Sequence, residues 1–197
     1  MSDVAWPAAS RPRSRPLPRG VATGAAMALL LLWILGLGAA PLFDVDEGAF
    51  AEASREMLAS GDWGHTTLNG ADRFDKPILV YWLQAAAIAA LGADEFAVRL
   101  PSALCAWLLC LVIGHHAARQ WGRAAGWMAA LLPATLLGPV LVGRAATADE
   151  LLHLLLALIV VDVARCLGAG TAGPPVHETR PPRLRVYAWI GLGLLAG

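Results

Sequence analysis

The sequence predicts an all-α polytopic membrane protein, in which transmembrane helices form a bundle and further helices lie at the membrane surface. Hydrophobic residues make up 57% of the chain, and charged residues only 15%, whereas soluble domains carry about 25% charged residues. Long apolar runs also alternate with short polar segments along the chain. This composition excludes an ordinary soluble domain, and nothing in it points to nucleic acid as a partner.

The membrane-spanning segments are predicted from apolar runs of about 20 residues, the length that crosses a hydrocarbon core of about 30 Å. They follow a basic, Pro-rich and Arg-rich tail at residues 1–20 that we expect to be disordered. The spans are expected at 21–40, 98–117, 124–143 and 150–167, with a fifth starting within 186–197. Residues 168–185 are expected to form a cytoplasmic linker. Because the fifth run stops short of a crossing length, we expect the N-terminal portion of a larger protein, one that can be inactive on its own.

The apolar run at 77–91 decides the topology. As a helix it would be about 23 Å long, which is short for a membrane span. If it crossed the membrane, the turn with Arg119 and Arg123 would lie on the opposite side from the basic tail. If it does not cross, every Arg cluster falls on the cytoplasmic side, as the positive-inside rule requires. We therefore predict a juxtamembrane helix at 77–91, a periplasmic loop over 41–97, a short outer loop at 144–149 and a cytoplasmic N-terminus.

A second juxtamembrane helix is predicted at about 49–60. Apolar residues from Phe50 to Leu58 recur at helical spacing, and Glu52, Arg55 and Glu56 share the other side. The residues that follow, 65–73, are expected to form a loop. This helix lies in the polar interval from Pro41 to Pro77, which holds eight of the 15 acidic residues of the chain, so we expect the chemistry here.

Asp46-Glu47 is the first candidate motif in this interval. A carboxylate just outside a membrane can act as a general base toward an acceptor, or can bind a divalent cation. The alternative is structural, because Asp44 and Glu47 have the spacing of a capping box for the helix that follows. Spacing alone favours the capping box.

Asp75-Lys76-Pro77 is the second candidate motif. Proline suits the first position of a helix, so Asp75 and Lys76 are expected at a helix N-terminus, where an anion is favoured. A lysine there makes a phosphate site. The alternative is that Asp75 only caps the helix and that the Lys76 side chain only extends to the membrane interface.

The third motif ends the third span, at Gly143 to Glu150. Thr147 and Glu150 have the spacing of a capping box, which leaves Asp149 unexplained. Ionisable groups at a membrane boundary are costly, so we expect Asp149 to complete a site with Asp46. Near the other end of the next span, Asp162 and Arg165 are predicted to form a local ion pair.

These motifs together resemble a known family. The blocks are DVDEGAFAEASREMLASGDW, RFDKPILVYWLQAAA, LGADEFAVRLPSAL and GRAATADELL, in this order within residues 21–167. They resemble the N-terminal part of bacterial GT-C glycosyltransferases, in the branch related to the aminoarabinose–lipid A transferase and, more distantly, to protein O-mannosyltransferases. The resemblance implies a GT-C-type helix bundle in the bacterial inner membrane.

The resemblance also implies an activity and a set of residues. The enzyme would move a sugar from a polyprenyl-phosphate donor to a lipid, glycan or protein acceptor on the periplasmic face, with inversion. Asp46, with Glu47 beside it, would be the catalytic base, and Lys76 and Arg73 would bind the donor phosphate. Asp75 and Asp149 would complete an acidic centre, where a divalent cation is an alternative to the lysine charge.

Two other classes of function remain open from the sequence. A transporter subunit would need ionisable groups near the middle of its spans, whereas these spans carry theirs near the ends. A non-catalytic membrane scaffold of the same family is the stronger alternative.

Overall fold

The structure, a computed structural model, describes residues 19–43, 45–166 and 180–196, and these are mostly helical. Residues 1–18 of the predicted tail and 168–179 of the predicted linker lie outside the described residues. The elements are α1 (Arg19–Ile34), α2 (Val45–Ser60), β1 (Thr67–Leu68), β2 (Ala71–Asp72), α3 (Leu79–Leu91), α4 (Glu95–Trp121), α5 (Arg123–Thr135), α6 (Leu137–Gly143), α7 (Asp149–Cys166) and α8 (Arg180–Leu194).

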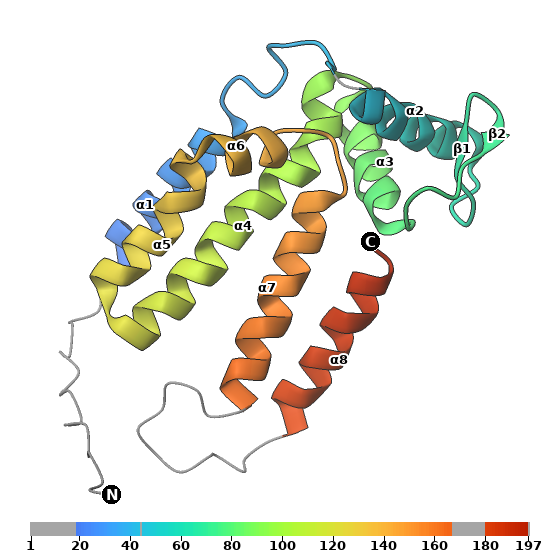
Figure 1. Ribbon diagram of the computed structural model, residues 1–197. Coiled ribbons are helices and arrows are strands. Elements are labelled where there is room, and N and C mark those ends of the chain that lie inside the picture. Colours follow the sequence, from blue (N-terminus) through green and yellow to red (C-terminus); the bar gives the residue numbers. More distant parts are fainter. Residues whose placement is uncertain (1–18, 44, 167–179, 197) are drawn as a thin grey trace, which may run out of the picture.

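The long helices lie side by side, with α4 at the centre of the bundle (Figure 1). Helices α1 and α5 pack on one side of α4, and α7 packs on the other, followed by α8. Helices α2 and α3 and the small hairpin gather at one end of the bundle (Figure 1). The turn between α4 and α5, with Arg119 and Arg123, and the end of α7, with Arg165, lie at the opposite end. The predicted topology requires this arrangement, although the side of the membrane stays a prediction.

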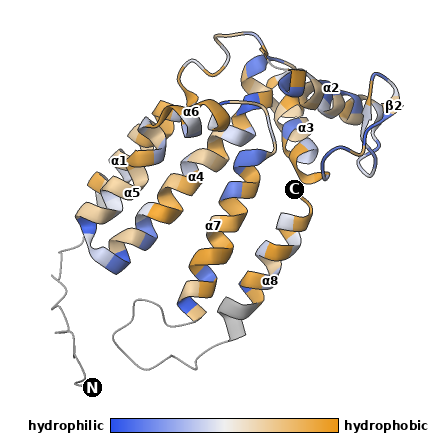
Figure 2. Ribbon diagram, viewed as in Figure 1, coloured by the Kyte–Doolittle hydropathy of each residue, from blue (hydrophilic) through white to orange (hydrophobic). Residues whose placement is uncertain are grey.

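Among the described helices, α4 has the length and apolar composition to cross a membrane by itself. Helices α5 and α6 meet the same criterion if they are counted as one broken span, whereas α1, α3 and α8 are shorter apolar helices. Large apolar side chains are exposed on several of the described helices, including Leu31, Met128 and Leu156. The ribbons of the long helices are largely apolar (Figure 2). Apolar surface of this extent is typical of contact with lipid or with further protein. The five-span topology stays a prediction.

The predicted first span, 21–40, is wrong at its C-terminal end, because α1 ends at Ile34. Gly36 adopts a φ of +70°, a left-handed conformation that glycine tolerates and that terminates helices. The backbone then turns, with the Leu37 N–H donating to the Ile34 carbonyl. The chain therefore reaches the start of α2 through a short irregular segment.

The predicted third span, 124–143, is also wrong as a single helix. The helix breaks at Leu136, which is extended (φ −84°, ψ 135°), and α5 and α6 meet at an angle of 69°. Pro139 accounts for the break, because it has no N–H to donate to the Thr135 carbonyl and its ring would clash with that carbonyl. At the end of α5, the Thr135 hydroxyl donates to the carbonyls of Leu131 and Leu132 in the same helix.

Other predicted boundaries shift as well. Helix α2 begins four residues before the predicted position of 49, so that Asp46 and Glu47 lie in its first turn. Helix α3 begins at Leu79 rather than at Pro77. Helix α4 extends to 95–121, beyond both ends of the predicted span. Helix α8 begins at Arg180, so the last part of the predicted linker is helical.

The predicted loop at 65–73 contains a minimal hairpin, in which Thr67 pairs with Asp72 and Leu68 pairs with Ala71. Asn69 and Gly70 make the turn, with φ values of 54° and 76°, and Asn-Gly is the preferred sequence for such a turn. The hairpin is tied to α2 because the Thr67 hydroxyl donates to the Glu56 carboxylate at 2.5 Å. The hairpin is a correction of the sequence prediction.

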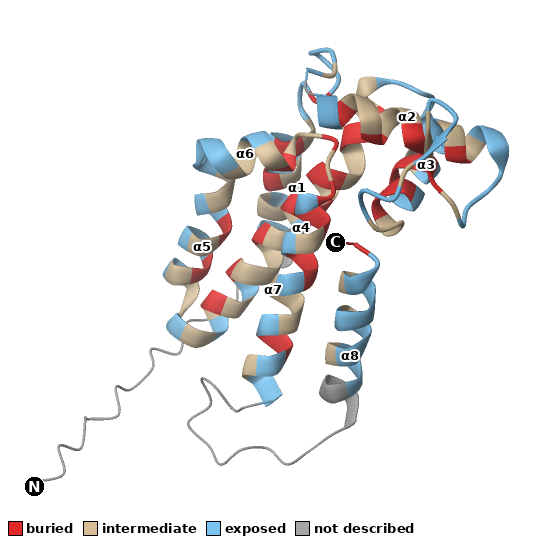
Figure 3. Cartoon of the chain, turned by 45° about the vertical axis from the view of Figure 1, so that its right-hand side comes forward, coloured by how far each residue is buried: buried red, intermediate tan, exposed pale blue. Residues whose placement is uncertain are grey.

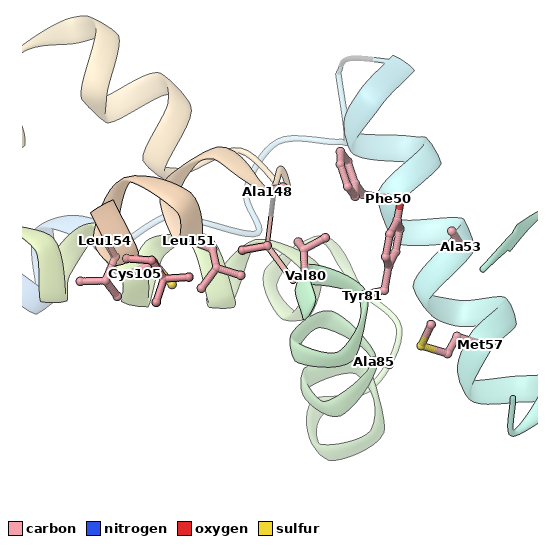
Figure 4. Packing of buried hydrophobic residues seen from close by; sticks show 12 residues of the cluster. Phe50, Ala53, Met57, Val80, Tyr81, Ala85, Cys105, Ala148, Leu151 and Leu154 are labelled. Carbon is pink, nitrogen blue, oxygen red and sulfur yellow. The ribbon is translucent and has the colours of Figure 1, made fainter. Parts of the chain in front are cut away.

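The predicted amphipathic character of α2 is confirmed. Phe50 and Met57 are buried, whereas Glu52 and Arg55 form an ion pair on the outer side. Figure 3 shows buried and exposed positions along α2. The Phe50 ring packs on Tyr81 of α3 with a centroid distance of 5.4 Å (Figure 4). A buried cluster continues from there to α4 and α7, where Leu151 and Leu154 contact Cys105 (Figure 4). One core thus joins the surface helices to the bundle.

The predicted ion pair between Asp162 and Arg165 is confirmed, with Nη1 of Arg165 3.0 Å from Oδ1 of Asp162. Asp162 is 1% exposed, and it also accepts a hydrogen bond from Nε1 of Trp189 in α8 at 3.0 Å. Arg185 of α8 lies 3.4 Å from the same carboxylate. Asp162 therefore links α7 to α8, in addition to pairing locally.

Helices α4 and α5 cross in close contact at small residues. A Cβ atom on Gly126 would lie 2.5 Å from the Ala118 Cβ and 2.9 Å from the Gly114 carbonyl oxygen. A Cβ atom on Gly114 would likewise lie 2.7 Å from the Ala130 Cβ. Small residues four apart on two facing helices are a recurrent packing device in membranes, where helices associate by close backbone approach.

We expect Gly126→Ala to destabilise the protein by about 1–3 kcal/mol, because the added methyl group forces α4 and α5 apart. Gly24→Ala in α1 is the control, since a Cβ atom there meets nothing within 4 Å and alanine favours helix. Thermal unfolding in detergent measures both variants. Equal unfolding temperatures for the two would contradict the close crossing.

Candidate active site

Glu47, in the first turn of α2, is 1% exposed and accepts four hydrogen bonds. Two come from Arg99 of α4, from Nε to Oε1 at 2.9 Å and from Nη2 to Oε2 at 2.8 Å. The Ala146 N–H donates to Oε1 at 2.7 Å, and the Phe43 N–H donates to Oε2 at 3.2 Å. This carboxylate therefore joins α2 to α4 and to the segment before α7.

Arg99 is equally well bonded. Its guanidinium also donates to the carbonyls of Leu37, Ala40 and Pro41, at 2.9, 2.7 and 2.9 Å. These carbonyls belong to the irregular segment between α1 and α2, where helical partners are missing. Arg99 and Glu47 form what we call the arginine–glutamate clamp. It holds the start of α2 in one position.

Arg144 supports the same region from the end of α6. Its guanidinium donates to the Leu32 carbonyl at 3.0 Å and to the Leu35 carbonyl at 2.7 Å, at the end of α1. Carbonyls in the last turn of a helix lack internal partners, and a cation there is favoured by the helix dipole. Two arginines therefore satisfy the carbonyls that the early end of α1 leaves free.

The pKa of Glu47 lies below its ordinary value of 4.5. Burial, the largest single influence, raises this pKa, but the hydrogen bonds from Arg99, Ala146 and Phe43 and the charge of Arg99 together outweigh it. The clamp therefore keeps Glu47 ionised at neutral pH.

A lowered pKa makes the stability depend on pH in a defined direction. The stabilisation from the Glu47 carboxylate is complete above the unfolded-state pKa, and it is lost as the pH falls through the lower pKa of the folded state. We expect the unfolding temperature to decrease between pH 6 and pH 3 in the wild type. The decrease should be smaller in Glu47→Gln, which cannot titrate at this position. An identical pH profile for the two proteins would contradict the assignment.

Asp46 is adjacent to Glu47 but has a different environment. Its side chain is exposed, and it has no hydrogen bond or ion pair with any residue that the structure describes. Asp44, the other half of the predicted capping box, lies outside the described residues. Of the two adjacent carboxylates, Glu47 has the contacts of a structural group, and Asp46 is open to a second molecule.

Arg73 lies where the hairpin returns to α3. Its Nη2 is 2.9 Å from the Asp75 carboxylate, and its Nε donates to the Tyr81 hydroxyl at 3.2 Å. The guanidinium also lies over the Phe50 ring, with its Cζ 5.7 Å from the ring centroid. Arg73 is therefore fixed in orientation. The predicted role of Asp75 in an acidic centre competes with its ion pair to Arg73.

Lys76 is exposed and has no hydrogen bond or ion pair with the part of the chain that the structure describes. It lines an open pocket of about 290 Å³ together with Arg73, Asp75 and His65. The pocket thus brings together both cations that the sequence analysis assigned to a donor phosphate. A mobile ammonium beside a fixed guanidinium suits an anion with several oxygens.

The predicted helix start at Pro77 is wrong, and the correction changes the proposed anion site. Helix α3 begins at Leu79, and the Leu79 N–H already donates to the Leu195 carbonyl at 2.9 Å. Pro77 has no N–H to offer. Lys76 and Arg73 are therefore the permanent cations that the pocket offers to an anion.

Asp149 lies exposed in the first turn of α7. The predicted capping box beside it is wrong, because the Thr147 hydroxyl is buried without a hydrogen-bond partner among the described residues. Glu150 is buried instead, and its carboxylate lies 3.6 Å from Nδ1 of His153.

The structure does not group the predicted acidic residues into a metal site. Within residues 19–43, 45–166 and 180–196, no three His, Cys, Asp or Glu side chains are grouped so that they could hold a metal ion. Asp46, Asp75 and Asp149 therefore do not fit a divalent cation in this arrangement.

Arg99 and Arg144 are the residues that the sequence analysis missed. Arg99 lies within the predicted span 98–117, where an ionisable residue is costly and calls for a partner. That signal was present in the sequence. The identity of the partner was not, because Glu47 lies 52 residues away.

Residues 75–196 match the family model described as dolichyl-phosphate-mannose-protein mannosyltransferase. The chain belongs to this family. It is 31% identical over 169 residues to an undecaprenyl phosphate-alpha-4-amino-4-deoxy-L-arabinose arabinosyl transferase of Aeromonas salmonicida, covering 85% of this chain and 29% of the relative. A second such transferase, from Pseudomonas fluorescens, is 33% identical, with 85% of this chain and 27% of the relative covered.

The fold of this chain is also similar to that of a solved structure. The crystal structure of ArnT from Cupriavidus metallidurans bound to undecaprenyl phosphate superposes with a TM-score of 0.79 at 26% identity, over 91% of this chain and 33% of that chain. The apo form of the same protein gives a TM-score of 0.74, over 89% of this chain and 33% of that one. The predicted GT-C-type helical fold and the predicted kinship with aminoarabinose transferases are confirmed. The chain spans about 30% of the length of these relatives.

Proposed function

We propose that this chain supplies the base and the donor-phosphate groups of a membrane glycosyltransferase. The sugar would come from a polyprenyl-phosphate donor, because the relatives are named for undecaprenyl phosphate and ArnT was solved with it. The acceptor would be a lipid, as the resemblance to the aminoarabinose–lipid A branch implies.

The contrast between Asp46 and Glu47 is the observation that carries this proposal. A general base must reach the proton of its acceptor and be free to take it. Asp46 is exposed and unpaired among the described residues, on a helix start that the arginine–glutamate clamp holds in place. Asp46 would remove the acceptor proton as the acceptor oxygen attacks the anomeric carbon, and the configuration would invert.

The leaving group would be the polyprenyl phosphate, held by Lys76 and Arg73. Charge that develops on the leaving phosphate oxygen is stabilised best by cations already in position. Arg73 is fixed by Asp75 and Tyr81, and Lys76 can move to the phosphate. Helices α2 and α3 would lie at the periplasmic face, because Arg119, Arg123 and Arg165 gather at the opposite end of the bundle.

Lys76 is the only lysine in the sequence, which makes a direct test of this site available. The test uses membranes with the longest natural form of this protein, a polyprenyl-phosphate donor labelled in the sugar, and a lipid acceptor. Wild-type protein should transfer the label. We expect Lys76→Met to raise the KM for the donor about 10-fold to 100-fold, because a charged hydrogen bond contributes about 1.5–3 kcal/mol.

Lys76→Arg is the matched control, since it keeps the charge and should lose less. Amine acylation gives a second readout, in which undecaprenyl phosphate should protect Lys76 but not the N-terminal amine. Absence of transfer by the inserted wild-type protein would overturn the proposed function. An unchanged KM together with unprotected Lys76 would overturn the phosphate site alone.

A further inference from the structure

An apolar groove lies between α1, α4 and α5, close to the end of the bundle opposite the candidate active site. Its volume is about 240 Å³, and Ala25 and Leu29 of α1 line one wall. Small residues of α4 and α5, at the close crossing described above, form its floor. Trp127 of α5 lies along it. The residues along the helices around it are largely apolar (Figure 2).

Basic side chains mark one end of the groove. Arg123 and His115 line it, and none of its lining residues is acidic. Arg119 follows His115 by four residues on α4, so it lies on the same face of that helix. The helix ends here are hydrophilic in an otherwise apolar region (Figure 2). The groove therefore combines an apolar body with arginine side chains at its mouth.

This combination matches one kind of molecule. Water is a poor occupant for an apolar groove, because it finds no polar partners there. A lipid acyl chain fills such a groove without losing hydrogen bonds, and a phosphate headgroup is attracted to arginine at a membrane surface. Tryptophan is also favoured at the boundary between headgroups and acyl chains.

We propose that this groove binds an anionic phospholipid, with an acyl chain between α1 and α5 and the phosphate near Arg123 and Arg119. The lipid would lie in the leaflet opposite the candidate active site. This site is distinct from the donor pocket at Lys76, and its test requires no sugar transfer.

The full chain in nanodiscs provides the test, with phosphatidylglycerol as the probe and phosphatidylcholine as the neutral comparison. Retained lipid is counted by native mass spectrometry. Ala25→Phe fills the groove, and Ala28→Phe is the matched control, because Ala28 is exposed on α1 and does not line it. Arg123→Gln and Arg119→Gln each remove one charge.

We expect wild type and Ala28→Phe to retain phosphatidylglycerol in preference to phosphatidylcholine, and Ala25→Phe to retain at least five-fold less. Each arginine variant should weaken phosphatidylglycerol binding about five-fold, because one basic residue near an anionic lipid contributes about 1 kcal/mol. Equal retention by Ala25→Phe and Ala28→Phe would overturn the site. So would a wild-type dimer that Ala25→Phe dissociates without loss of lipid, since a second copy would then occupy the groove.

Discussion

Arg99→Met is expected to destabilise the protein by about 3–5 kcal/mol. Removing one partner of a buried ion pair leaves the other charge buried without compensation, and this costs far more than the intact pair contributes. Glu47 would keep only the N–H groups of Ala146 and Phe43, and three carbonyls before α2 would lose their donor. Thermal or chaotrope unfolding in detergent measures the loss.

A double-mutant cycle separates the two contributions of Arg99. Glu47→Leu combined with Arg99→Met removes both charges, so it should recover part of the stability lost in Arg99→Met alone. Recovery should be incomplete, because the Leu37, Ala40 and Pro41 carbonyls still lack a donor. Arg55→Met is the control, since it breaks the exposed pair with Glu52 and should not change stability measurably. If Arg99→Met unfolds at the same temperature as Arg55→Met, the clamp does not stabilise the fold.

Features with a local cause were predictable from the sequence. The buried face of α2 follows from apolar residues at helical spacing, and Phe50 and Met57 lie where the spacing places them. Asp162 and Arg165 pair because residues three apart meet on a helix. The break at Leu136 also has a local cause, Pro139. The long apolar run around this proline nevertheless favoured the prediction of a single span.

The division of roles between Asp46 and Glu47 was not predictable in this way. Adjacent residues on a helix point about 100° apart, so one of the two carboxylates turns toward the bundle and the other toward solvent. Which one turns inward depends on Arg99 and on the Ala146 N–H, 52 and 99 residues away. The helix start at Val45 decides it as well, and it lies four residues before the predicted start.

The arrangement of the aspartates depends on the same long-range contacts. Asp149 follows a pattern that sequence reasoning can find, a carboxylate at a helix start, whereas α3 begins only four residues after Asp75. Their distance from Asp46 depends on how α2 packs on α3 and on how α3 and α7 pack on α4, which no spacing encodes. Asp75 is instead paired with Arg73, two residues before it.

Asp46→Asn is expected to lower the rate of sugar transfer about 100-fold to 10,000-fold, the range that a general base contributes. Asparagine has nearly the same size and stays polar, but it cannot take the acceptor proton at neutral pH. Because Asp46 is exposed and unpaired among the described residues, the change should alter stability only through the helix dipole, by about 0.3–1 kcal/mol. The transfer rate at saturating donor and the unfolding temperature are measured on the same preparation.

Glu52→Gln on α2 is the matched control, because it removes one negative charge from the same helix away from the proposed chemistry. It should keep transfer activity within about two-fold, as expected for a surface substitution. Loss of activity in Asp46→Asn with an unchanged donor KM would place the defect in the chemical step rather than in donor binding. If Asp46→Asn transfers sugar as fast as Glu52→Gln, another group is the base, and the exposed position of Asp46 needs a different explanation.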